Sequence, residues 1–261
     1  MRIRVIDGDL EDDVVLVQST GIPVDENYME LFLTLDALKR SGARSITLIS
    51  PYLGYERQDH VFRDGEEVGF EMIVKILETL RVDKLITFDM HSIKLPSMFT
   101  IPVAQLSALP LFAKKIEKGT VLVSPDMGGI RRIKILGELT GCEFATIEKD
   151  RDLSSGSVQS NSMEGDVKGK NVAVVDDMIS TGGTIKAAVE LLKRKGALEI
   201  SVFATHAVFS GDSHQLLANL PIEKVVVTDT LEIPENKLFD KLEAISIADL
   251  VVKKLNSNLK A

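Results

Sequence analysis

Two adjacent carboxylates and the loop that follows them are the residues best suited to chemistry in this sequence. Asp176 and Asp177 come after an apolar run, and the loop continues as Ser180-Thr181-Gly182-Gly183-Thr184. Glycines let a backbone close around a phosphate, and hydroxyl groups add donors to it. A carboxylate pair suits a sugar diol or a hydrated metal. A phosphate cradle beside a diol acceptor points to a sugar phosphate as the ligand.

The elements on either side would position this loop at a strand end and a helix start. Asn171–Val175 is apolar and rich in β-branched residues, which predicts a buried strand, and Ile185–Lys193 predicts a helix. Free N–H groups and the positive dipole end make a helix N-terminus an anion site. A plain turn is the alternative, and the number of phosphate-binding residue types in this loop argues against it.

Apolar strands alternate with amphipathic helices along the rest of the chain. The predicted strands are 14–17, 45–49, 84–88, 120–123, 143–147, 171–175, 199–205 and 224–228. The predicted helices are 26–41, 68–80, 109–118, 129–140, 184–196, 213–220 and 247–255. This alternation favours an α/β fold with mainly parallel sheets, whose ligands bind beyond the carboxyl ends of the strands.

Composition narrows the class of protein. The chain has 261 residues, 44% of them hydrophobic and 27% charged, with a net charge of −8. That acidic balance argues against a nucleic-acid partner, and no apolar run approaches the ~20 residues of a membrane span. Cys142 is the only cysteine, which excludes an internal disulfide and fits a reducing compartment. We expect a cytoplasmic protein.

Length favours two domains. Ile101-Pro102-Val103, with Pro110 soon after, marks the expected hinge, so the predicted domains are residues 1–108 and 109–261. Asp150–Lys168 is predicted to be one long polar loop, and a loop of that length in a compact domain is usually functional.

The segment from Asp176 to Thr184 resembles the phosphoribosyl-diphosphate (PRPP) binding motif of phosphoribosyltransferases and PRPP synthetases. Further motifs match PRPP synthetases (ribose-phosphate diphosphokinases) in the family's order and cover nearly the whole chain from Val14. These motifs are Tyr55-Glu56-Arg57-Gln58-Asp59, Asp89-Met90-His91, Ser124-Pro125-Asp126-Met127-Gly128-Gly129 and Lys149-Asp150-Arg151. Several modest motifs in register make the resemblance specific.

The resemblance implies two phosphoribosyltransferase-type domains, each a mainly parallel sheet flanked by helices, the first on the nucleotide side and the second binding ribose 5-phosphate. It implies Mg²⁺-dependent transfer of diphosphate from ATP to the C1 hydroxyl of ribose 5-phosphate. Asp176, Asp177, Ser180, Thr181, Gly182, Gly183 and Thr184 would hold ribose 5-phosphate. Arg57, Gln58, Asp59 and His91 would bind ATP, with His91 and Asp126 near the metal. Lys149 and Arg151 would be catalytic.

Two departures from the family pattern bear on ATP. Relatives have a further strand–helix unit before the position of Arg2, and Val68-Gly69-Phe70-Glu71 replaces a segment that carries a lysine. A non-catalytic regulatory homologue, paired with a longer paralogue, is therefore one alternative. A PRPP-consuming phosphoribosyltransferase is the other. The family also implies a homo-oligomer, a dimer or higher, because its nucleotide site is shared between subunits.

Overall fold

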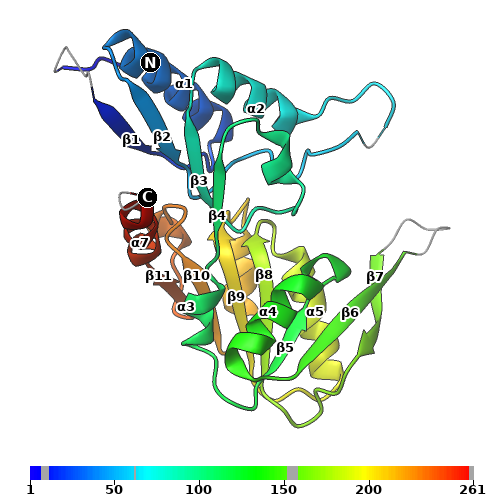
Figure 1. Ribbon diagram of the computed structural model, residues 1–261. Coiled ribbons are helices and arrows are strands. Elements are labelled where there is room, and N and C mark those ends of the chain that lie inside the picture. The colour runs from blue at the N-terminus through cyan, green and yellow to red at the C-terminus, as the bar shows by residue number, and fades with distance from the viewer. Residues whose placement is uncertain (7–11, 62, 152–157, 259–261) are drawn as a thin grey trace. The chain divides into compact units, whose positions relative to one another are not determined.

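The computed structural model describes residues 1–6, 12–61, 63–151 and 158–258, with the backbone alone at 148–151, 158–162 and 258. The chain divides into two compact units, Met1–Ser107 and Ala108–Ala261. A mainly parallel sheet flanked by helices forms the centre of each unit (Figure 1). The predicted α/β fold class is therefore confirmed.

The first unit is a four-stranded parallel sheet in the order β1-β2-β3-β4. Its elements are β1 (Asp13–Val17), α1 (Val24–Arg40), β2 (Ser45–Ile49), α2 (Gly69–Thr79), β3 (Lys84–Phe88), η1 (Leu95–Met98) and β4 (Val103–Leu106). Leu31 and Leu35 of α1 and Ile73 and Leu77 of α2 share one core with Leu48 of β2. These helix residues recur every four positions, so each helix buries one face against the sheet.

The second unit is a seven-stranded sheet in the order β11-β10-β9-β8-β5-β6-β7, parallel except for β7. Its first elements are α3 (Leu109–Ala113), β5 (Val121–Ser124), η2 (Met127–Gly129), α4 (Ile130–Thr140), β6 (Phe144–Arg151) and β7 (Val158–Glu164). The later ones are β8 (Val172–Ile179), α5 (Gly183–Arg194), β9 (Ile200–Ala207), α6 (Ser213–Asn219), β10 (Lys224–Thr228), η3 (Glu235–Lys237), β11 (Leu242–Ile245) and α7 (Ala248–Asn258).

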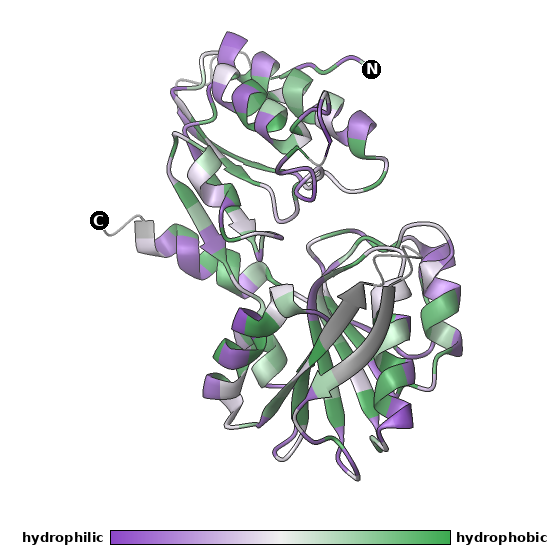
Figure 2. Ribbon diagram, turned by 90° about the vertical axis from the view of Figure 1, so that its right-hand side faces the viewer, coloured by the Kyte–Doolittle hydropathy of each residue, from purple (hydrophilic) through white to green (hydrophobic). Residues whose placement is uncertain are grey.

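Helices cover both faces of this second sheet. Val121 and Val123 of β5 share a core with residues of α5, whereas Leu122 between them packs with Ile133 and Leu136 of α4. Successive side chains of a strand point to opposite faces, so a strand buried on both sides is apolar throughout. Figure 2 shows the central strands of this sheet largely in the colour of hydrophobic residues.

The chain order of the second sheet reverses beside β5. From β5 the chain moves outward to β6, and it then returns to the other side of β5 as β8. In an open α/β sheet the crevice at such a switch point, beyond the carboxyl ends of the strands, is where ligands bind. We therefore expect a ligand site at the segments that follow β5 and β8.

Some elements differ from the sequence-based prediction. The residues 150–168 are not one loop, because Val158–Glu164 forms β7, which pairs antiparallel with β6. The helix expected over 109–118 ends at Ala113. The strands β4 and β11, four residues each, were not predicted.

None of the described helices is long and apolar enough to cross a membrane.

Candidate functional site

The loop after β8 is shaped for an anion at the start of α5. Gly182 caps the helix with a φ of +79°, a left-handed conformation that glycine adopts without strain. Thr181, Gly183 and Thr184 are exposed. The first turn of the twelve-residue α5 presents N–H groups that have no partner within the helix. An open hollow lined by Thr181, Ser210 and residues of α6 lies beside the loop.

The carboxylate pair belongs to β8 itself, which runs to Ile179 rather than ending at Val175 as predicted. Pairing with β9 continues through Asp176 opposite Ala204 and Met178 opposite His206. Because β9 supports the strand on that side, the two carboxylates stand on regular backbone and not on a loop. Rigid elements hold functional groups more accurately than loops do.

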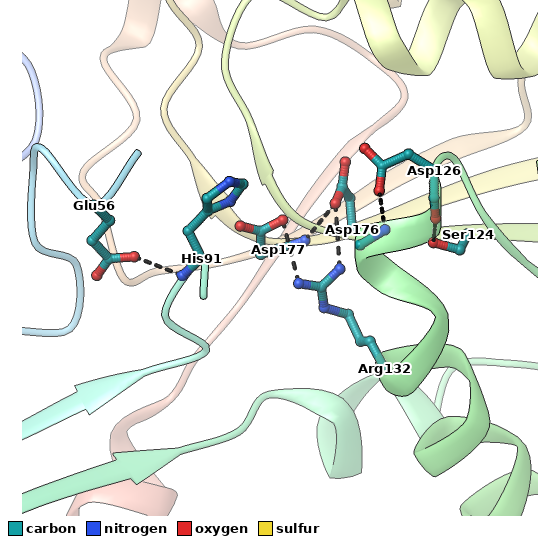
Figure 3. A network of polar contacts seen from close by, with 8 residues as sticks. Glu56, His91, Ser124, Asp126, Arg132, Asp176 and Asp177 are labelled. Atoms are coloured by element: carbon teal, nitrogen blue, oxygen red, sulfur yellow. Dashed lines mark hydrogen bonds and ion pairs between the residues drawn. The ribbon is translucent and has the colours of Figure 1, made fainter. Parts of the chain in front are cut away.

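Arg132 of α4 joins the two carboxylates, as Figure 3 shows. Its Nη1 lies 3.3 Å from Oδ1 of Asp176, and its Nη2 lies 3.3 Å from Oδ1 of Asp177. The N–H of Asp177 donates to Oδ1 of Asp176 at 2.9 Å. The side chains of Arg132, Asp176 and Asp177 are 15%, 14% and 5% exposed, so this charge cluster is largely withdrawn from water.

The buried carboxylates influence each other's ionisation. Burial raises the pKa of Asp176 well above the ordinary aspartate range, the negative charge of Asp177 raises that pKa further, and the charge of Arg132 opposes both. A carboxyl group that is costly to ionise in the empty protein gains from a cation or a hydroxyl donor brought by a ligand. A raised pKa of this kind is typical of functional sites.

The segment after β5 faces the same end of the sheet. Asp126 caps η2 by accepting the Gly128 N–H at 3.0 Å, and Ser124 Oγ donates to the Asp126 carbonyl at 2.6 Å (Figure 3). A Cβ at Gly129 would lie 2.3 Å from Ser124 Oγ, so a larger residue there would displace the Ser124 hydroxyl. The charge of Asp126 also contributes to the raised pKa of Asp176, which places the predicted metal residue beside the carboxylate pair.

Sequence reasoning missed Arg132. A signal was present, because Arg131 and Arg132 follow the Gly-Gly of the Ser-Pro-Asp loop in the first turn of a helix. The helix dipole disfavours cations in that turn, so an arginine there needs a partner.

The residues predicted for ATP belong to the first unit. Arg57 and Gln58 are exposed and Asp59 is half-buried. Glu56, 1% exposed, accepts the backbone N–H of His91 at 2.9 Å (Figure 3). The structure therefore brings the Arg-Gln-Asp segment and the Asp-Met-His segment together at one end of the first sheet.

Two backbone features mark this end of the first unit as specialised. Asp89, at the end of β3, has a φ of +28°, which is costly for a residue other than glycine. Such strain is concentrated at functional sites. Gly69 lies so near Gln58 that an added Cβ would come 2.4 Å from Gln58 Oε1. A larger residue at this position would therefore displace the amide of Gln58, which is predicted to bind ATP.

The predicted catalytic residues Lys149 and Arg151 are in β6, where they pair with Ser160 and Val158 of β7. The register shifts between Glu148 and Lys149. Their side chains lie outside the described residues.

Within the described residues, no group of three or more His, Cys, Asp and Glu side chains forms a metal-binding cluster. His91 and Asp126 belong to different units. The acidic side chains of the second unit fit a weakly held hard cation, because Mg²⁺ binds through few carboxylates and keeps several waters.

Comparison with known proteins agrees with this geometry. A family model described as the N-terminal domain of ribose phosphate pyrophosphokinase matches residues 3–80, and a phosphoribosyl transferase domain model matches residues 108–232. The ribose-phosphate pyrophosphokinase 1 of Streptococcus agalactiae is 38% identical over 245 residues, which are 91% of this chain and 76% of that protein. The ribose-phosphate pyrophosphokinase of Aquifex aeolicus is 38% identical over 96% of this chain and 82% of its own length.

A crystal structure of the phosphoribosylpyrophosphate synthetase from Mycobacterium smegmatis matches with a TM-score of 0.90 and 35% identity, covering 98% of this chain and 86% of that one. The resemblance seen in the motifs is therefore confirmed over most of the chain, in sequence and in fold. This chain belongs to the ribose-phosphate pyrophosphokinase family.

Proposed function

We propose that this protein is a PRPP synthetase, which transfers the diphosphate of ATP to the C1 hydroxyl of ribose 5-phosphate and releases AMP. In this reaction the C1 oxygen forms a bond to the β-phosphorus, the bond from that phosphorus to the oxygen of the α-phosphate breaks, and the hydroxyl proton leaves. The proposal rests on the buried carboxylate pair of β8, which lies beside the open N-terminus of α5. The carboxylate pair suits a sugar diol, and the helix N-terminus suits a phosphate.

Ribose 5-phosphate would bind along the end of β8 and the start of α5. Its phosphate accepts from the N–H groups and hydroxyls of Ser180–Thr184, and its ring hydroxyls donate to Asp176 and Asp177. The dipole of α5 and the hydroxyl donors favour a dianion at this point. Arg132 holds both carboxylates in place, and its charge favours ionisation of Asp176.

ATP would bind the first unit, with Arg57 on phosphate oxygens and Gln58 at the adenine edge. Mg²⁺ would accompany ATP and neutralise charge on its phosphates. Asp126 provides carboxylate oxygen of the kind this cation prefers, whereas the imidazole of His91 suits a metal-bound water or a phosphate better.

Lys149 and Arg151 would stabilise the migrating diphosphate, since phosphoryl transfer depends on positioned positive charge more than on covalent help from the protein. We also propose that the chain acts as a homo-oligomer. Val15 and Val17 of β1 are 48% and 64% exposed, which fits a surface covered in an assembly. Light scattering at working concentration measures the assembly directly.

A binding experiment tests the ligand assignment separately from turnover. Calorimetric titration should show that ribose 5-phosphate binds, that ribose without its phosphate binds at least about a hundredfold more weakly, and that inorganic phosphate competes. Equal binding of ribose and ribose 5-phosphate would mean that the loop does not hold the phosphate.

A further inference from the structure

The start of the ribose-phosphate loop is tied to the segment that follows β9. The N–H of Phe209 donates to the Ile179 carbonyl at 2.9 Å, and the N–H of Ser210 donates to the Ser180 carbonyl at 3.0 Å. The hydroxyls of Ser180 and Ser210 are also 3.0 Å apart. The position of Ser180, and of the N–H groups after it, therefore depends on where residues 209 and 210 stand.

Phe209 holds a conformation that its side chain disfavours. Its φ is +43°, in the left-handed region, where a residue with a Cβ is strained. The ring is 1% exposed and packs against Phe239 with ring centres 6.3 Å apart. Such strain persists only where neighbouring contacts compensate for it.

One such contact comes from Lys237, at the end of η3. Its ammonium group donates to the Phe209 carbonyl at 2.5 Å, and the lysine is partly buried. A charged donor makes a stronger hydrogen bond than a neutral one, and a carbonyl left without its donor in a buried position is costly. Lys237 thus holds the peptide group that joins Phe209 to Ser210, and the N–H of that same group donates to the Ser180 carbonyl.

We propose that Lys237 is a positioning residue for the ribose-phosphate loop, acting through Phe209 and Ser210; this rests on the proposed function of that loop. Lys237 does not itself touch the substrate in this account. It fixes the carbonyl of Phe209, which keeps the 209–210 segment in register with Ile179 and Ser180. Loss of the ammonium lets Phe209 relax, and the loop then meets the sugar phosphate less well organised.

The second unit provides a matched control. Lys241 Nζ donates to the carbonyls of Ala218 at 3.0 Å and of Leu220 at 2.8 Å. It makes the same kind of contact as Lys237 and comes from the same connection between β10 and β11. It binds the carboxyl end of α6 and the residue after it, not the 209–210 segment, so it supports the fold without supporting the loop.

The test compares Lys237→Met, Lys237→Arg and Lys241→Met by steady-state kinetics and thermal melting. Lys237→Met should raise KM for ribose 5-phosphate about tenfold and leave KM for ATP within about twofold, since one charged hydrogen bond is at stake. Lys237→Arg should restore most of the loss. Lys237→Met and Lys241→Met should lower the melting temperature by similar amounts. Lys241→Met should leave KM for ribose 5-phosphate unchanged.

Equal effects of Lys237→Met and Lys241→Met on KM for ribose 5-phosphate would overturn the proposal. Should Lys237→Met not fold, hydrogen exchange on the unaltered protein decides the matter. Ribose 5-phosphate should protect the amides of Phe209 and Ser210 from exchange. If it adds no protection there, the proposal is overturned. If the unaltered protein bound no ribose 5-phosphate at all, the proposed function would fail, which is a different result from binding that ignores Lys237.

Discussion

Asp176 shows at the scale of one residue how a site can oppose the stability of its own fold. Its folded pKa is raised by burial and by Asp177, so between the unfolded and the folded pKa the folded state holds a proton that the unfolded chain has already released. Stability therefore falls as pH rises from the unfolded value through the folded one. We propose that this carboxylate serves the ligand and not the fold.

Asp176→Asn should therefore raise the melting temperature at pH 8 and lose binding of ribose 5-phosphate. The amide keeps the shape and removes the charge that is costly to bury. Calorimetric melting and titration measure both effects. The control is Glu190→Gln on the exposed face of α5, where a loose pair with Lys186 at 3.9 Å should make little difference. A lower melting temperature for Asp176→Asn at pH 8 would contradict the account.

Substitution of Arg132 should lower the stability of the fold, opposite to the effect of Asp176→Asn. Arg132→Met leaves two largely buried carboxylates without their cation, which should cost about 3 kcal/mol of unfolding free energy at pH 8 in urea titrations. Much of that loss should return in the double variant with Asp176→Asn, because the like-charge repulsion is then gone. Arg131→Met, on the exposed neighbour, should be nearly neutral. A neutral Arg132→Met would mean that the carboxylates do not depend on it.

At the scale of elements, the sequence predicts best where an element is long and apolar on a regular period. The stripe of Leu31, Leu35 and Leu38 defines α1, and the apolar run before Asp176 defines most of β8. Short strands are decided by tertiary pairing instead. β4 and β11 have four residues each, and β7 is a polar strand that pairs with β6 at the edge of the sheet. Their local sequences do not set them apart from loops.

Substitution of the glycine at the start of α5 can be compared with that of a glycine outside the site, which distinguishes backbone strain from a role in binding. Gly182 and Gly141 both have left-handed φ, +79° and +72°, so alanine at either should cost about 1 kcal/mol of stability. Gly182→Ala should also raise KM for ribose 5-phosphate, because the added Cβ shifts the loop, whereas Gly141→Ala, at the end of α4, should not. Denaturant unfolding and kinetics together give the comparison. Equal KM values for the two variants would show that this loop conformation is irrelevant to binding.

At the scale of the whole molecule, the candidate site has two kinds of residue: those in one continuous segment, and those that come from distant parts of the sequence. Asp176–Thr184 is one continuous segment, so residue types and spacing were enough to propose it as a ribose-phosphate site. Arg132 of α4 contacts that segment directly, and Lys237 of η3 contacts Phe209, whose N–H donates to Ile179 within the segment. Only the fold creates these contacts. A sequence pattern cannot report such contacts, because no local period or spacing encodes them.

The central claim is that this chain makes PRPP, and product analysis tests it most directly. With ATP, Mg²⁺ and ribose 5-phosphate, the protein should form AMP and PRPP in equal amounts, and AMP formation should stop when ribose 5-phosphate is left out. Formation of ADP in place of AMP would mean transfer of a single phosphoryl group. Absence of both AMP and PRPP, from protein that is folded and binds ribose 5-phosphate, would contradict the account.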